Sequence, residues 1–125
     1  MSPRPLLTQD EFHNVKMSMI LPVMLDVLQQ DMKKMNQSKL RLDVVYIKSL
    51  DKAQECVLKE LLQLKTEHKK KGIRIYEETR TPEGIRGKFQ CRGYEHTIFL
   101  LWEKVRAEML VKCSEYLQVS LTEGG

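Results

Sequence analysis

The segment IRIYEETRTPEGIRGKFQCR, residues 73–92, decides the predicted fold because it places the signature of a β-hairpin inside a mostly helical sequence. Two runs that alternate apolar and polar residues flank the loop TPEG at residues 81–84. Pro82 suits the second position of a type I turn, and Gly84 suits the left-handed residue that follows such a turn. We therefore expect two antiparallel strands joined by this loop.

The loop also predicts which residues face each other across the hairpin. It places Thr81 opposite Ile85, and further along it places Ile75 opposite Cys91. A register shifted by one residue would divide the apolar side chains between the two faces. Gly87, inside the second strand, is expected to mark a bulge or a close packing contact. The apolar face predicted in this way consists of Ile73, Ile75, Ile85, Phe89 and Cys91.

The opposite face of the expected hairpin is basic, and Glu78 is its acidic residue. In this register Arg74 faces Arg92 and Arg80 faces Arg86, and like charges directly opposite each other cost stability. Such a face suits an anionic ligand. An alternative is a solvated outer face on which long cationic side chains cover the sheet and keep its edge from aggregating. The predicted binding residues are Arg74, Tyr76, Arg80, Arg86, Lys88, Gln90 and Arg92.

A long helix is expected before the hairpin. Thr8 is a good N-cap, and Glu11 stands three residues later, as a capping box requires. Apolar residues continue with a helical period over residues 12–35. Pro22 removes one backbone donor and clashes with the preceding turn, so we expect a kink, or two helices that meet near Leu21.

This first helix is apolar almost all round near Pro22. Such a helix is usually central in a fold or shared with a second subunit. We therefore expect a homodimer, formed through this helix or through the apolar seam of the next one. The residues of the predicted dimer interface are Met19, Ile20, Val23, Met24, Val27 and Leu28.

The second helix is expected to run from about Leu40 to Lys70, because its apolar residues form one seam with steps of three and four. Its opening, LRLDVVY at residues 40–46, also alternates with a period of two, so a short strand is the alternative there. A break in the helix between Ser49 and Asp51 is a second open question.

Gly72 is expected to end the second helix in a left-handed conformation. A third helix is expected from about Glu95 to Leu117, on a stripe that includes Trp102. The predicted fold is therefore α+β and mostly α. It is a bundle of three helices with one antiparallel β-hairpin between the second and the third. We expect one domain over residues 1–125, with flexible ends at 1–7 and 119–125.

Composition narrows the class of protein. Hydrophobic residues make up 42% of the 125 residues and charged residues 30%, which is typical of a globular domain. Three cysteines, Cys56, Cys91 and Cys113, are an odd number with wide spacing, which favours a reducing compartment over a disulfide framework. The most apolar run, residues 19–28, contains Asp26 and is too short to span a membrane. We therefore expect a cytoplasmic protein without membrane contact.

Motifs for catalysis are weak. The sequence has no phosphate-binding glycine loop and no histidine or cysteine spacing typical of a metal site, so we expect neither cofactor nor metal. Cys91 and His96 lie five residues apart and could act as a nucleophile and a base. The expected register points Cys91 inward, however, which favours a small buried apolar side chain.

The sequence therefore favours a small, non-catalytic binding or regulatory module. Its basic hairpin face would contact an acidic protein partner or a phosphate backbone, and its net charge of +4 permits either. The first alternative is a DNA-binding regulator, because the helix and basic hairpin over residues 58–92 are similar to the wing of winged-helix proteins. The second alternative is a small enzyme that uses the region of Cys91 and His96.

Overall fold

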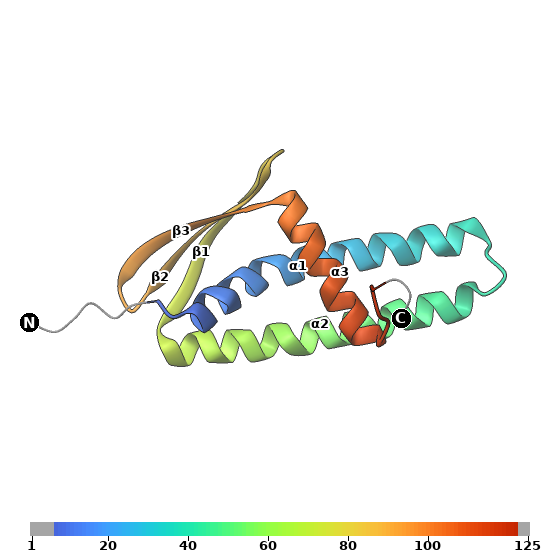
Figure 1. The fold of residues 1–125 in the computed structure, drawn as a ribbon, viewed down its shortest axis with the longest axis horizontal. Coiled ribbons are helices and arrows are strands. Elements are labelled where there is room, and N and C mark those ends of the chain that lie inside the picture. Colours follow the sequence, from blue (N-terminus) through green and yellow to red (C-terminus); the bar gives the residue numbers. More distant parts are fainter. Residues whose placement is uncertain (1–6, 123–125) are drawn as a thin grey trace, which may run out of the picture.

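A computed structural model describes residues 7–122. It contains three helices and a three-stranded antiparallel sheet, and the sheet lies between the second and third helices in the chain (Figure 1). This confirms the predicted fold class, α+β and mostly α. The predicted flexible ends lie partly outside the described residues, at 1–6 and 123–125. The elements are α1 (Gln9–Ser38), α2 (Asp43–Lys71), β1 (Ile73–Arg80), β2 (Gly84–Cys91), β3 (Tyr94–Leu101) and α3 (Trp102–Leu117).

The predicted start of α1 is confirmed. The Glu11 backbone N–H donates to Thr8 Oγ1 at 3.0 Å, and the Thr8 N–H donates to Glu11 Oε1 at 3.0 Å, so the capping box is complete. The helix is a single element of 30 residues with Pro22 inside it, and it does not divide into two helices near Leu21.

Helix α2 is also continuous. It begins at Asp43, three residues after the predicted start, so residues 43–46 are helical and residues 40–42 form the turn from α1. No break occurs between Ser49 and Asp51. Gly72 ends the helix with a φ of 68°, which confirms the predicted left-handed C-cap.

Strand β3 was not predicted from the sequence. Residues Tyr94–Leu101 form a strand, and the last helix begins only at Trp102, so the predicted helix start near Glu95 is wrong. Arg92 and Gly93 have φ values of 50° and 87°, the left-handed pair that a two-residue type I′ hairpin turn requires. This turn sends the chain back along β2 and makes β2 the central strand, in the order β1-β2-β3.

The predicted register of the β1–β2 hairpin is also wrong. Ile85 faces Arg80 rather than Thr81, because the Thr81 N–H donates to the Gly84 carbonyl at 2.8 Å and makes the loop shorter. Gly84 does not have the positive φ that we expected. It is glycine for another reason: an added Cβ would lie 2.1 Å from the Leu100 carbonyl oxygen of β3.

A bulge at Tyr76 preserves the apolar face despite the changed loop. The register shifts between Ile75 and Glu77, so that Ile75 faces Phe89. Beyond the bulge, Ile73 and Ile75 return to the side of the sheet that carries the buried residues of β2. The two expected pairs of opposed arginines do not form. Their partners across the hairpin are Gln90 for Arg74, Ile85 for Arg80 and Thr79 for Arg86.

Helix α1 is the centre of the fold. In Figure 1 its first half lies between the sheet and α2, which runs antiparallel to it. Gly87 of β2 packs directly on this helix, because an added Cβ would lie 2.6 Å from Met19 Sδ. This confirms the predicted close contact at Gly87. The buried core of α1 consists of Val15, Met17, Met19, Ile20, Leu21, Val23, Met24 and Leu28.

The residues of the predicted dimer interface therefore lie inside one chain. Five of the six, Met19, Ile20, Val23, Met24 and Leu28, are buried in the core, and Val27 packs against it partly buried. Their apolar character needs no second subunit to explain it.

Helix α3 crosses both long helices (Figure 1). Lys112 Nζ of α3 lies 2.6 Å from Glu60 Oε1 of α2, and Glu108 Oε1 of α3 lies 3.2 Å from Lys16 Nζ of α1. At its start, Trp102 Nε1 donates to the Thr81 carbonyl at 2.8 Å, which ties α3 to the β1–β2 loop. None of the described helices combines the length and the apolar character needed to cross a bilayer.

Candidate groove beside strand β1

The predicted basic face is divided in the structure. Arg74, Arg86 and Lys88 lie on the outer face of the sheet, where they are exposed. Arg80 belongs to the other face, and its Nη2 lies 3.0 Å from Asp26 Oδ2 of α1.

Other residues of the predicted site lie at the margins of this outer face. Tyr76 lies at the bulge, and Gln90 is half-buried in β2. Lys88 Nζ lies 3.2 Å from Glu77 Oε2, so one cation of the outer face is paired with a carboxylate of the neighbouring strand β1. The outer face is therefore less basic than the sequence predicted.

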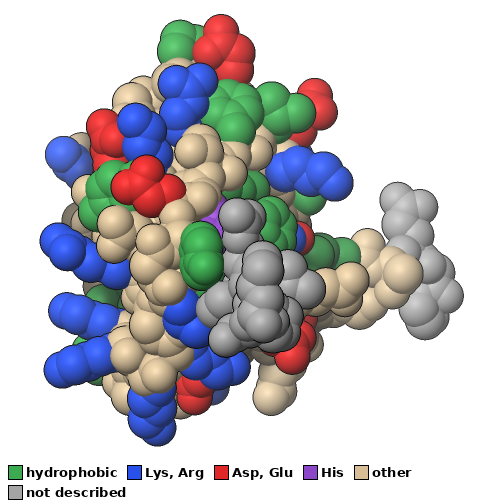
Figure 2. All heavy atoms as spheres, turned by 90° about the vertical axis from the view of Figure 1, so that its left-hand side faces the viewer, with side chains coloured by type: hydrophobic (Ala, Val, Ile, Leu, Met, Phe, Trp, Pro, Cys, Tyr) green, Lys and Arg blue, Asp and Glu red, His purple; other side chains and the backbone are tan. Residues whose placement is uncertain are grey.

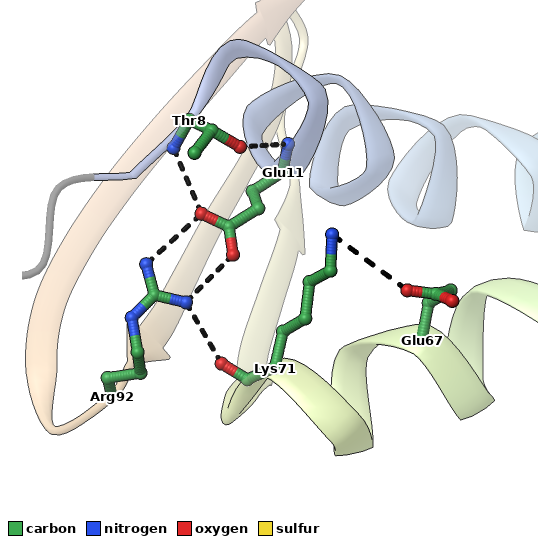
Figure 3. Close-up of polar contacts among 5 residues, drawn as sticks. All are labelled: Thr8, Glu11, Glu67, Lys71 and Arg92. Atoms are coloured by element: carbon green, nitrogen blue, oxygen red, sulfur yellow. Dashed lines mark hydrogen bonds and ion pairs between the residues drawn. The ribbon is translucent and has the colours of Figure 1, made fainter.

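Arg92 has a structural role that the sequence did not indicate (Figure 3). Its Nη1 donates to Glu11 Oε2 at 2.7 Å, and its Nη2 donates to Glu11 Oε1 at 3.1 Å. The same Nη1 donates to the Lys71 carbonyl at 3.1 Å, and the Arg92 backbone N–H donates to the Gly72 carbonyl at 2.8 Å. These contacts join the start of α1, the end of α2 and the β2–β3 turn, and we call them the Arg92 clasp.

Glu11 is only 5% exposed, and its charge is stabilised by the clasp. Hydrogen bonds from Arg92 and from the Thr8 backbone lower the pKa of Glu11 from 4.5 to about 2, although burial opposes this shift. Both partners are therefore charged at neutral pH, and Arg92 is engaged within the fold rather than presented to a ligand.

A groove of about 700 Å³ lies between the end of α2 and the start of β1. Leu61, Ile73 and Ile75 give it an apolar lining, and Ser18 of α1 also lines it. The groove is lined in full by Ser18, Leu61, Lys65, His68, Lys69, Gly72, Ile73, Arg74 and Ile75. Of the predicted binding residues, only Arg74 belongs to it.

The groove is basic. Lys65, Lys69 and Arg74 line it, and none of the three forms an ion pair with any residue of the described chain. Figure 2 looks onto the end of the molecule where α2 ends, and many Lys and Arg side chains lie along the left side and the bottom of this view. The groove therefore combines apolar surface with cations that lack a carboxylate partner, which is a combination suited to an acidic and partly apolar ligand.

His68 lines the groove from α2 and is 8% exposed. Its Nε2 is buried and has no hydrogen-bond partner among the described residues. Burial lowers the pKa of His68, which favours the neutral ring, while the nearby carboxylates of Glu11 and Glu67 oppose this shift. In the sequence, His68 falls at a position of the apolar seam of α2, which gives no sign of a groove. Lys65 and Lys69 are one helical turn apart, and His68 lies between them in the sequence. This spacing was the signal in the sequence for a basic groove.

The surroundings of Cys91 do not favour an activated nucleophile. Cys91 is 1% exposed, and burial raises the pKa of its thiol even though Arg92 acts in the opposite direction. A reactive cysteine needs a lowered pKa and access to solvent. The His96 ring instead stacks on Phe89, with 5.1 Å between the ring centroids.

Comparison with known proteins gives one result. The family described as YhjD protein matches residues 6–121, which is nearly the whole chain. No match was found among curated proteins or among solved structures. The chain therefore belongs to the YhjD protein family.

Proposed function

We propose that this member of the YhjD family is a non-catalytic binding module that holds an acidic protein partner in the groove between α2 and β1. One observation carries the proposal: three unpaired cations, Lys65, Lys69 and Arg74, line a groove whose other surface is mostly apolar.

An acidic protein segment suits this groove better than a bare phosphate backbone. Leu61, Ile73 and Ile75 offer apolar contact that a peptide side chain can use and that a phosphate cannot. The Lys and Arg residues favour carboxylates by charge and speed their approach. We therefore favour a partner whose binding segment carries both acidic and apolar residues.

Nucleic acid is the second candidate, and the outer face of the sheet favours it. The Arg86 guanidinium lies 5.7 Å from the centroid of the exposed Phe99 ring, and Tyr76 is also exposed. Cations beside aromatic rings are the elements of a surface that binds single strands. The likeness to winged-helix proteins is weaker, because α2 is one helix of 29 residues without the tight turn that a helix-turn-helix motif requires.

A charge-reversal experiment tests the proposed partner class. We expect a polyglutamate peptide to bind the wild-type protein and to bind the double variant Lys65→Glu, Lys69→Glu at least about tenfold more weakly, because two attractive charges become repulsive. Fluorescence anisotropy with a labelled peptide at low salt measures the effect. The matched control is Lys33→Glu, Lys34→Glu, which makes the same change in net charge on exposed positions of α1.

Two outcomes would count against this proposal. One is an equal loss of peptide affinity in both double variants, which would mean that net charge alone, and not the groove, causes the effect. The other is preferential binding of a short single-stranded DNA that is lost in Arg86→Ala, which would favour the nucleic-acid candidate.

We also propose that the protein is cytoplasmic and dimeric. Cys56, Cys91 and Cys113 are all unpaired, which supports a reducing compartment. The apolar residues available for a dimer differ from those expected from the sequence and gather at the turn between α1 and α2. Those exposed there are Leu40, Leu42, Val44, Val45 and Tyr46.

The dimer gives a direct prediction. We expect light scattering to show twice the mass of the chain at high protein concentration, and we expect Val44→Asp, Val45→Asp to produce a monomer with an unchanged circular dichroism spectrum. The reason is that both side chains are exposed in one chain, so only association between chains is affected. A wild-type protein that stays monomeric at high concentration would rule the dimer out.

A further inference from the structure

Strand β1 has a free edge, and the groove runs along it. In the sheet order β1-β2-β3, and within the described residues 7–122, β1 pairs only with β2. Its first residues, Ile73, Arg74 and Ile75, line the groove on one side, and α2 lines it on the other. An edge strand carries backbone N–H and C=O groups that a further strand can bind.

The direction of these groups follows from the antiparallel ladder. The Gly72 carbonyl accepts from the Arg92 N–H at 2.8 Å, so Gly72 points its carbonyl towards the β2 side. Backbone groups in an antiparallel strand point alternately to one neighbour and to the other. Arg74 therefore points its groups towards β2, whereas Ile73 and Ile75 point theirs into the groove.

The opposite wall has the spacing of one helix face. Leu61, Lys65 and His68 follow each other on α2 at intervals of four and three residues, with Lys69 beside them. A segment lying between this wall and β1 would meet apolar side chains on the inner side and cations on the outer side. The bulge at Tyr76 ends regular pairing, so the binding edge is limited to Ile73–Ile75.

We propose that the partner segment binds in extended conformation as a fourth strand against the free edge of β1. This inference rests on the proposed function and specifies its partner: a short segment in which apolar and acidic residues alternate. Its backbone bonds to Ile73 and Ile75, its apolar side chains enter the groove, and its carboxylates meet Arg74, Lys65 and Lys69. Main-chain bonds supply affinity in this mode, and the alternating side chains supply specificity.

Methylated peptides test strand addition separately from charge. The probe is an octapeptide that alternates valine and glutamate, together with one version methylated on every valine nitrogen and another on every glutamate nitrogen. Only one set of alternate amides can face β1. We expect one methylated peptide to bind at least about tenfold more weakly than the other, since it loses main-chain hydrogen bonds. All three peptides carry the same charge, and the protein is unaltered.

Amide exchange measured by NMR locates the contact. We expect the unmodified peptide to slow exchange of the Ile75 amide and to leave that of Arg74 unchanged, because Arg74 already pairs with β2. Binding of both methylated peptides with equal affinity, without protection of Ile75, would overturn strand addition and leave the acidic-partner proposal intact. If none of the three peptides binds at low salt, both proposals are wrong.

Discussion

Replacing Glu11 with alanine is expected to lower the free energy of unfolding by about 3 kcal/mol, because it breaks the Arg92 clasp at a carboxylate that is almost fully buried. The substitution removes both bonds to Arg92 and the capping box with Thr8. Chemical denaturation monitored by circular dichroism measures the loss. The matched control is Glu67→Ala, which breaks only the exposed pair with Lys71 at 3.9 Å and should cost less than about 0.5 kcal/mol.

The clasp also predicts a dependence of stability on pH. Folding lowers the pKa of Glu11 from 4.5 to about 2, so its contribution is fully present above pH 4.5 and is lost as the pH falls towards 2. We expect wild type to lose more stability than Glu11→Gln over this range. Identical acid profiles for the two proteins would mean that Glu11 is not held by Arg92 as described here. So would additive effects of Glu11→Ala and Arg92→Ala in the double variant.

Replacing Gly84 with alanine is expected to cost about 3 kcal/mol, although the side chain gains only one methyl group. The new Cβ would lie 2.1 Å from the Leu100 carbonyl oxygen and 2.9 Å from its carbon, so strands β2 and β3 must separate at that point. A backbone neighbour cannot move without breaking the ladder. Thermal unfolding of the variant and wild type measures the cost.

Gly87→Ala is the matched control for this prediction. It makes the same change in the same strand, but the nearest atoms, 2.6 and 2.8 Å away, belong to the flexible end of Met19. This side chain can shift within the core, so we expect a smaller cost of about 1 kcal/mol. Equal costs at the two positions would contradict the distinction between a backbone neighbour and a side-chain neighbour.

Features set by local chemistry could be predicted from the sequence. The capping box needs only Thr8 and Glu11 at the right spacing, and the end of α2 needs only Gly72 after a run of good helix formers. The helices are long, so their periodic patterns were clear. The helical class of the fold and the place of the hairpin followed from these local signals.

Features set by contacts between distant residues could not be predicted in this way. Ile98 and Trp102 are four residues apart, which suits a helix, yet Ile98 and Leu100 alternate with the exposed Phe99 and Leu101 in a strand. The left-handed conformation of Arg92 and Gly93 favours the strand over the helix, because it turns the chain back along β2. The Arg92 side chain is held by Glu11, 81 residues away in the sequence. No local pattern reports such a contact.

The register and the groove were missed for related reasons. The hairpin loop is closed by Thr81 and Gly84, and Gly84 is selected by the approach of β3 rather than by turn chemistry. The groove needs α2 and β1 to lie side by side, so the pattern of the hairpin alone contains only Arg74 of its cations. The predicted basic face and the groove therefore share Arg74 alone among the predicted binding residues.

The position of α3 has a mechanical consequence. Its ion pairs reach Glu60 of α2 and Lys16 of α1, so α3 connects the two long helices. These contacts oppose lengthwise sliding of one long helix past the other. The turn between α1 and α2 lies at the far end of the two long helices, beyond α3 and the sheet (Figure 1). A force applied at that turn would therefore act on helix segments that lie outside the part held by α3, at the opposite end from the groove.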